Sequence, residues 1–114
     1  MEPLTYVLPF AAASTRGTIE IGGLAPIRLL VGTGWSSTAA QIRPRVSEDG
    51  TTFYPLYDAD NAAYTVTVAA GRAYILEPSD FVGVTYLRLL GTTAQGTASA
   101  QSTACTVTIV ARAL

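Results

Sequence analysis

The sequence of 114 residues contains no histidine, and all seven of its basic residues are arginines, so lysine is missing too. Histidine is the usual general base and the commonest ligand of transition metals, and lysine supplies the amine of Schiff-base enzymes. A chain without these two residues has few means of acid–base, covalent or zinc chemistry. We therefore expect a protein that is not an enzyme and that holds no cofactor or metal.

Charge of either sign is also scarce. Charged residues make up 13% of the chain, against about 25% in a typical globular domain, and the net charge is -1. Nucleic acids and anionic membranes attract proteins with a strong basic field, so neither is expected as the main partner. Because 49% of the residues are hydrophobic, we expect a partner or further copies of the chain to cover part of its surface.

The single cysteine, Cys105, cannot form a disulfide within the chain. It shares one face of a predicted strand with Val107 and Ile109, and no cation is adjacent to stabilise a thiolate, so we interpret it as a buried structural thiol. No apolar run approaches the roughly 18 residues of a membrane-spanning helix. Glu2 stands where a signal peptide carries positive charge, so we expect the protein to be made and folded in the cytosol.

Short runs of alternating apolar and polar residues, separated by Gly, Pro and Asp, fill most of the chain. This pattern is typical of an antiparallel β-sandwich or barrel. The run at 63–70 has the cleanest alternation, and 77–81 is expected to form one helical turn. The predicted fold class is all-β, an antiparallel two-sheet sandwich of jelly-roll type with eight or nine strands. The expected strands are residues 4–10, 17–21, 26–32, 40–47, 51–58, 63–70, 72–77, 84–91 and 104–112.

The first sixteen residues allow two interpretations. We expect residues 17–114 to form the sandwich, and residues 1–16 to form either an N-terminal arm or an edge strand. Leu4, Tyr6, Leu8 and Phe10 lie on one side of the first run, which suits a core strand. The small residues that follow would also let this segment detach and add to a neighbouring subunit or a larger surface.

Half of the eight acidic residues lie between positions 48 and 60, namely Glu48, Asp49, Asp58 and Asp60. They could form a calcium loop, a pair of glycosidase carboxylates, or the turns at the two ends of one strand. An EF-hand loop requires a glycine and a distant glutamate that this spacing lacks, and glycosidase carboxylates must face each other across a sugar. Asp-Gly and Asp-Asn are turn dipeptides. We therefore favour turns, with Phe53 as the core residue of the strand between them.

Trp35, Arg43 and Arg45 are further candidates for contact with a partner. Trp35 could stack on a sugar or anchor an interface, but we favour a role in closing one end of the sandwich. Arg43 and Arg45 point to the same side of a strand that Pro44 marks as an edge or a bulge, because proline cannot donate to a sheet. They are either solvated charges that protect this edge or a docking patch for an acidic partner.

From about Thr18 to Arg112, the order of these signals resembles a group of small β-sandwich proteins encoded beside the head genes of tailed bacteriophages. The run Ser47–Leu56 is the most recognisable part, whereas the turn DADNAA and the first ten residues depart from the pattern. The resemblance is carried by Trp35 with TAAQI, VSEDGTTFYPLYD, TVTVAAGRAYIL, FVGVTYLRLLGT, Gln101 and TVTIVAR.

The resemblance implies a structural protein of the virion that assembles in the host cytoplasm. As a decoration or cement protein it would bind the outer head lattice through the major capsid protein, as a homotrimer. The alternative is a carbohydrate-binding module on the virion surface or tail, because discoidin-type sandwiches have similar final strands and Trp35 could stack on a sugar. The candidate contact residues are Leu4, Tyr6, Leu8, Phe10, Trp35, Arg43 and Arg45.

Overall fold

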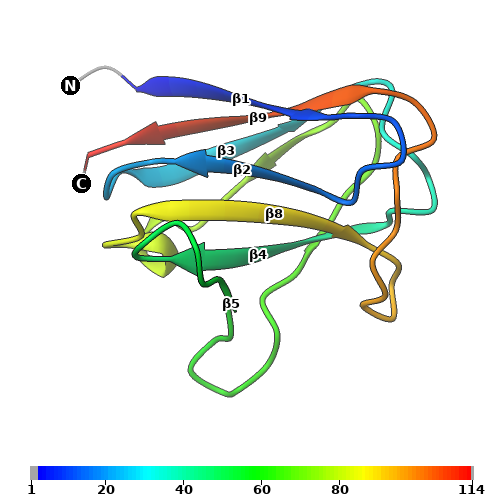
Figure 1. The fold of residues 1–114 in the computed structure, drawn as a ribbon. Coiled ribbons are helices and arrows are strands. Elements are labelled where there is room, and N and C mark those ends of the chain that lie inside the picture. Colours follow the sequence, from blue (N-terminus) through cyan, green and yellow to red (C-terminus); the bar gives the residue numbers. More distant parts are fainter. Residues whose placement is uncertain (1–2, 114) are drawn as a thin grey trace.

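The computed structural model describes residues 3–113, which form an almost entirely β protein (Figure 1). The predicted all-β class is confirmed, and the predicted helical turn is a short 3-10 helix, η1. No helix in residues 3–113 is long and apolar enough to cross a membrane. In chain order the elements are β1(Leu4–Phe10), β2(Arg16–Glu20), β3(Ala25–Val31), β4(Gln41–Ser47), β5(Tyr54–Pro55), β6(Val66–Thr67), β7(Ala73–Ile75), η1(Pro78–Phe81), β8(Tyr86–Thr92) and β9(Cys105–Arg112).

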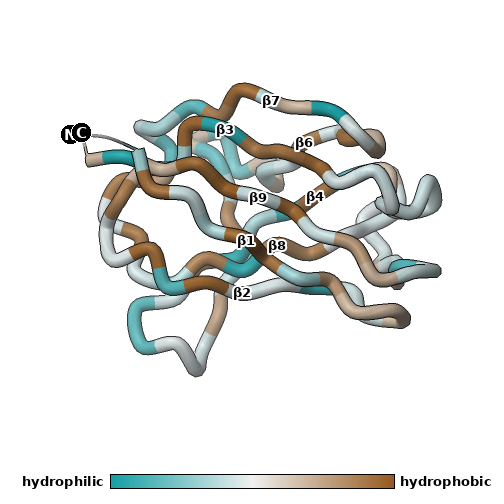
Figure 2. Tube along the Cα trace, turned by 90° about the horizontal axis from the view of Figure 1, so that it is seen from above, coloured by the Kyte–Doolittle hydropathy of each residue, from teal (hydrophilic) through white to brown (hydrophobic). Residues whose placement is uncertain are grey.

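The strands form two antiparallel sheets that pack as a sandwich. The first sheet has the order β1-β9-β3-β7, and the second has the order β2-β8-β4-β5, with β6 also paired to β4. Seen from above, β1, β9, β3 and β7 lie side by side (Figure 2). The strands β1 to β4 alternate between the sheets, and so do β7 to β9. With β5 and β6 taken as two halves of one broken strand, this is the predicted jelly roll.

The core lies between the sheets, where each strand points alternate residues inward. Phe10, Leu29 and Ile109 enter it from the first sheet, and Ile42 and Leu87 enter it from the second, each at most 1% exposed. Full burial of such a side chain contributes about 1.5–3 kcal/mol. The alternation in the sequence correctly predicted the face of β9 on which Ile109 lies.

The first strand, β1, lies at the edge of the first sheet. It pairs with β9 along its whole length, from Leu4 opposite Ala111 to Phe10 opposite Cys105. Leu8 and Phe10 are completely buried. The segment therefore completes the core of its own chain in this structure and does not extend away from it as an arm.

The fourth strand, β4, is internal, which corrects the expectation that Pro44 marks an edge. It pairs with β8 on one side and with β5 and β6 on the other. The carbonyl of Pro44 accepts the Leu56 N–H at 3.1 Å, on the β5 side. In an extended residue the N–H and C=O point to the same side of the strand. The nitrogen of Pro44, which carries no hydrogen, therefore also points to the side of β5 and β6. The hydrogen bonds between β4 and β8 do not need this donor.

The run with the cleanest alternation forms one of the shortest strands. Within residues 63–70 only Val66–Thr67 pairs as a strand, β6. The N–H of Tyr64 bonds to the Leu56 carbonyl and the N–H of Val68 bonds to the Ala40 carbonyl, both at 2.9 Å. The chain is thus extended but changes its pairing partner along its length, and Tyr64 and Val68 still pack on the core.

Candidate functional site

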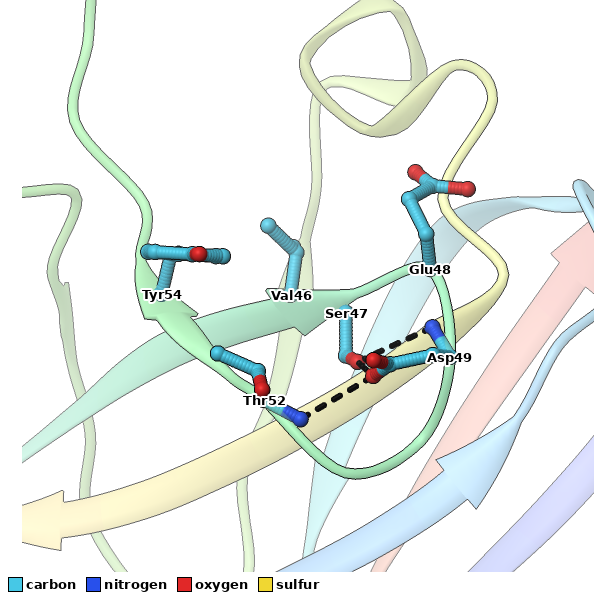
Figure 3. A pocket seen from close by; sticks show the side chains of 6 residues that line it. All are labelled: Val46, Ser47, Glu48, Asp49, Thr52 and Tyr54. Atoms are coloured by element: carbon cyan, nitrogen blue, oxygen red, sulfur yellow. Dashed lines mark hydrogen bonds between the residues drawn. The ribbon is translucent and has the colours of Figure 1, made fainter.

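The first acidic turn follows β4 and uses its carboxylate to hold its own backbone (Figure 3). Asp49 accepts the Thr51 N–H at 2.8 Å, the Thr52 N–H at 3.0 Å and the Ser47 hydroxyl at 3.0 Å. These bonds, from Thr52 first, lower the pKa of Asp49. Gly50 has φ +78°, a left-handed conformation that glycine adopts without steric cost. The predicted turn is confirmed.

The second acidic turn has the same construction. The Asp58 carboxylate accepts the N–H groups of Asp60 and Ala62, both at 2.9 Å, and Asn61 has the left-handed φ of 62°. These are the local side-chain bonds by which aspartate stabilises turns. In the described part of the chain, no group of three or more acidic, cysteine or histidine side chains is placed to hold a metal ion.

A pocket of about 340 Å³ lies beside the first acidic turn (Figure 3). Its two carboxylates both make structural bonds, because Asp49 holds the turn and Glu48 accepts the Thr85 hydroxyl at 3.1 Å. The six lining residues are Val46, Ser47, Glu48, Asp49, Thr52 and Tyr54.

Phe53 does not anchor the core, contrary to the sequence prediction. β5 begins only at Tyr54, so Phe53 remains in the connection that precedes the strand and is half-buried. Its ring lies under the guanidinium group of Arg88, 3.8 Å from the ring centroid. Arg88 alternates with the buried Leu87 and Leu89, so this contact lies on the outer face of the second sheet.

Trp35 is a core residue of the connection between β3 and β4, and only 5% of it is exposed. Its indole N–H donates to the Ala39 carbonyl at 2.7 Å, and its ring meets Phe10 edge to face, 5.1 Å between centroids. It cannot stack on a sugar while this fold is intact. The assignments of Trp35, Leu8 and Phe10 as contact residues are corrected for this reason, whereas Leu4 and Tyr6 keep part of their surface exposed.

Cys105 is half-buried, so it is less enclosed than the sequence predicts. It packs against the core, and its thiol lies 3.5 Å from the side-chain oxygen of the buried Gln101. Burial raises the pKa of the Cys105 thiol, which disfavours the reactive thiolate. The structural role expected for this cysteine fits these surroundings.

Arg43 and Arg45 share the outer face of the second sheet with two arginines that lie far away in the sequence. Arg45 pairs directly with Arg88 of β8, and Arg43 and Arg16 flank Leu90 from opposite sides. We call these four residues, Arg16, Arg43, Arg45 and Arg88, the arginine face. Sequence reasoning identified only the pair on β4, because the other two join it through the pairing of β2 and β8.

Two arginines of this face are held in place by neighbours. The Nε of Arg88 donates to the Thr18 hydroxyl at 2.9 Å, and Nη2 of Arg43 donates to the side-chain oxygen of Gln41 at 3.1 Å. Burial, followed by the positive charges of Arg16 and Arg45, lowers the pKa of Arg88. The charges of Arg16 and Arg45 are therefore close enough to that of Arg88 to repel it.

The outer face of the first sheet is more apolar, and its charged residue on β3, Arg28, lies opposite Ile75. Val7 is 57% exposed, Leu30 37% and Ile75 82%, and Thr108 of β9 lies between Val7 and Leu30 in the paired register. We call Val7, Leu30, Ile75 and Thr108 the apolar face. The strands β1, β3, β7 and β9 contain no acidic residue, and hydrophobic segments run along them (Figure 2).

A pH-dependent contact joins the segment before β6 to η1 through Tyr64, whose ring meets Phe81 edge to face with 5.4 Å between the ring centroids. Burial, then the charge of Asp80 and a hydrogen bond to it, and last the charge of Glu77, raise the pKa of Tyr64 from 10.0 to about 12. Deprotonation is easier in the unfolded chain, so the stabilisation is complete below pH 10 and is lost as the pH rises toward 12.

We therefore expect the free energy of unfolding to fall between pH 10 and pH 12, and Tyr64→Phe to reduce this fall. Urea titrations at several pH values would measure both. Tyr86, whose pKa is raised chiefly by its hydrogen bond to Glu20, contributes to the fall in the same direction, so the exposed Tyr57 supplies the matched control, Tyr57→Phe. An identical slope in the native chain and in Tyr64→Phe would contradict the assignment to Tyr64.

No model of a known protein family matches the chain, and no curated protein matches it. Among solved structures, it is similar to the Drosophila NLP core, whose structure is described as providing insight into pentamer formation and histone binding. The sequence identity is 14%, the TM-score is 0.44, and the match covers 96% of each chain. At this TM-score the similarity carries no argument about function or assembly.

Proposed function

We propose that this chain is a non-enzymatic decoration or cement protein that binds the outside of a phage head as a homotrimer and stabilises the shell. The observation that carries the proposal is the apolar face. A sheet surface with exposed Val7, Leu30 and Ile75, on strands without acidic residues, is poorly suited to permanent contact with water. Such surfaces are typical of sites that bind another protein.

The identity of the partner comes from the sequence resemblance and not from the fold. The run Ser47–Leu56, Gln101 and the terminal strand resemble small virion proteins of tailed phages, which makes the major capsid protein the proposed partner. The exposed part of Leu4 and Tyr6 at the start of β1 would extend the contact beyond the apolar face.

The proposed stabilisation works by mass action. A protein that binds only the mature shell shifts the equilibrium away from shell disassembly in proportion to its affinity and concentration. A trimer would engage several capsid subunits together, so that modest individual contacts gain from a high effective concentration. A non-enzymatic role agrees with the lack of histidine and lysine and with the structural bonds of the pocket carboxylates.

The test combines light scattering of the purified protein with thermal denaturation of shells, with and without the protein. We expect a trimer that raises the melting temperature of the shell. Val7→Glu should weaken this effect, because it places a charge on the apolar face opposite the uncharged Thr108. Val82→Glu, which adds the same charge at an exposed residue between η1 and β8, is the matched control. A monomer that leaves the melting of the shell unchanged would contradict the proposal.

The carbohydrate-binding alternative relied on Trp35 to stack on a sugar, but Trp35 lies in the core. Binding of the native chain to a host glycan, with loss of binding on substitution of the exposed Tyr54, would restore it.

A further inference from the structure

The apolar face and the proposed cement role leave the arginine face on the opposite sheet unexplained. We propose that the arginine face binds a carboxylate-rich segment of another protein. This inference concerns the second sheet alone and does not depend on the attachment to a capsid.

The pairing of three strands sets the spacing of the four charges. Arg16, Leu90 and Arg43 form one row across β2, β8 and β4, and Thr18, Arg88 and Arg45 form the next. Neighbouring strands lie about 4.8 Å apart, and residues two apart on one strand lie about 7 Å apart. The four arginines therefore lie in two adjacent rows, within the reach of a few consecutive acidic side chains.

A small pocket lies between two of these arginines. It has a volume of about 150 Å³, and Arg43, Arg45, Leu90 and Tyr57 are among its lining residues, which include no acid. The enclosed Nε of Arg43 has no hydrogen-bond partner among the described residues. A carboxylate side chain in this pocket would meet two positive charges, and guanidinium groups bind carboxylates through paired hydrogen bonds.

The arginine face destabilises the isolated chain, and two of its side chains are already held in position before any ligand binds. Like charges that face each other across a strand pair are destabilising, as Arg45 and Arg88 are here. The guanidinium group of Arg88 stacks on the ring of Phe53. Arg43 packs closely against Gly96, where a Cβ would lie 2.9 Å from the guanidinium carbon. Groups already held in their binding positions lose little freedom when a ligand arrives.

The surroundings favour an acidic protein segment over a nucleic acid. Glu48 and Asp49 follow the end of β4, and Glu20 lies on β2 in the same alternation as Arg16 and Thr18, so acids adjoin the arginine face on two of its strands. A nucleic acid strand longer than the face would pass these negative charges, and its affinity depends on a broad basic field. A short carboxylate segment would contact the four arginines alone.

The test is a calorimetric titration of the full chain with a peptide of about ten alternating glutamate and glycine residues. The test variant is Arg16→Gln with Arg45→Gln, because no side-chain hydrogen bond of either residue holds the described fold. The matched control is Arg28→Gln with Arg112→Gln, which removes the same charge from strands of the first sheet. We expect the test variant to bind at least about tenfold more weakly than the native chain, and the control to bind as the native chain does.

The stability of the test variant gives an independent measurement. Removal of the repelling charges should leave its melting temperature equal to or above that of the native chain, so weaker binding would not reflect unfolding. Undetectable peptide binding, or equal loss in the control, would overturn the proposal. Tighter binding of a single-stranded DNA of similar length would overturn it in favour of a nucleic acid partner. A chain that binds the peptide but leaves shell melting unchanged would contradict only the proposed cement role.

Discussion

Replacement of Trp35 with alanine is expected to lower the free energy of unfolding by about 3–5 kcal/mol. The substitution empties a site that the surrounding chain fills closely, since even a Cβ at Gly91 would lie 3.3 Å from the indole ring. It also removes the edge-to-face contact with Phe10 and the hydrogen bond to the Ala39 carbonyl. Urea denaturation followed by far-ultraviolet circular dichroism would measure the loss.

Two further variants separate the causes of this loss. Trp35→Phe keeps an aromatic ring near Phe10 but leaves the Ala39 carbonyl without its donor, which should cost about 1–3 kcal/mol. Tyr57→Ala removes an aromatic side chain that is 52% exposed and should change stability by less than about 0.5 kcal/mol. If Trp35→Ala were as stable as the native chain, Trp35 would have to be a surface residue, as the contact interpretation assumed.

The fold class could be predicted because it depends on local patterns. Alternation with a period of two determines which face of each strand is inward, and Gly, Pro and Asp mark the ends of the strands. This alternation predicts that Val107 and Ile109 share one face of their strand, and both are completely buried. The jelly roll followed from the number and spacing of the strands.

The errors arose where pairing over long distances decides the outcome. Pro44 indicates an edge strand, yet it lies in the internal strand β4. The strand tolerates the proline because its neighbour on one side is split into β5 and β6. Residues 63–70 alternate well, but the partners of Tyr64 and Val68 lie on two different segments. No local pattern encodes which segments become neighbours.

The same limit applies to the candidate surfaces. The acidic turns are local, so the bonds of Asp49 and Asp58 could be anticipated from their dipeptides. The arginine face is not local, because Arg16 and Arg88 join Arg45 only through the registers of β2, β8 and β4. The net charge of -1 gives no sign of this cluster, because it sums the charges of the whole chain and does not show where they lie on the surface.

Replacement of Phe10 with alanine is the second large effect that we expect, at about 3–5 kcal/mol of unfolding free energy. Phe10 is completely buried, and a Cβ at Gly17 of the opposite sheet would lie 3.1 Å from its ring. The cavity left by the ring could therefore close only by movement of both sheets. Val7→Ala is the matched control on the same strand, because Val7 points outward and is 57% exposed. It should change stability by less than about 0.5 kcal/mol.

This pair of variants decides between the two interpretations of the N-terminal segment. An edge strand that completes the core makes Phe10→Ala costly and Val7→Ala nearly neutral, whereas an arm that leaves the sandwich makes both neutral in the isolated protein. The double variant Phe10→Ala with Trp35→Ala adds an internal check. Because the two rings meet edge to face, the combined loss should differ from the sum of the single losses by about 0.5–1.5 kcal/mol. Strict additivity would mean that the first strand does not bring Phe10 to Trp35 in solution.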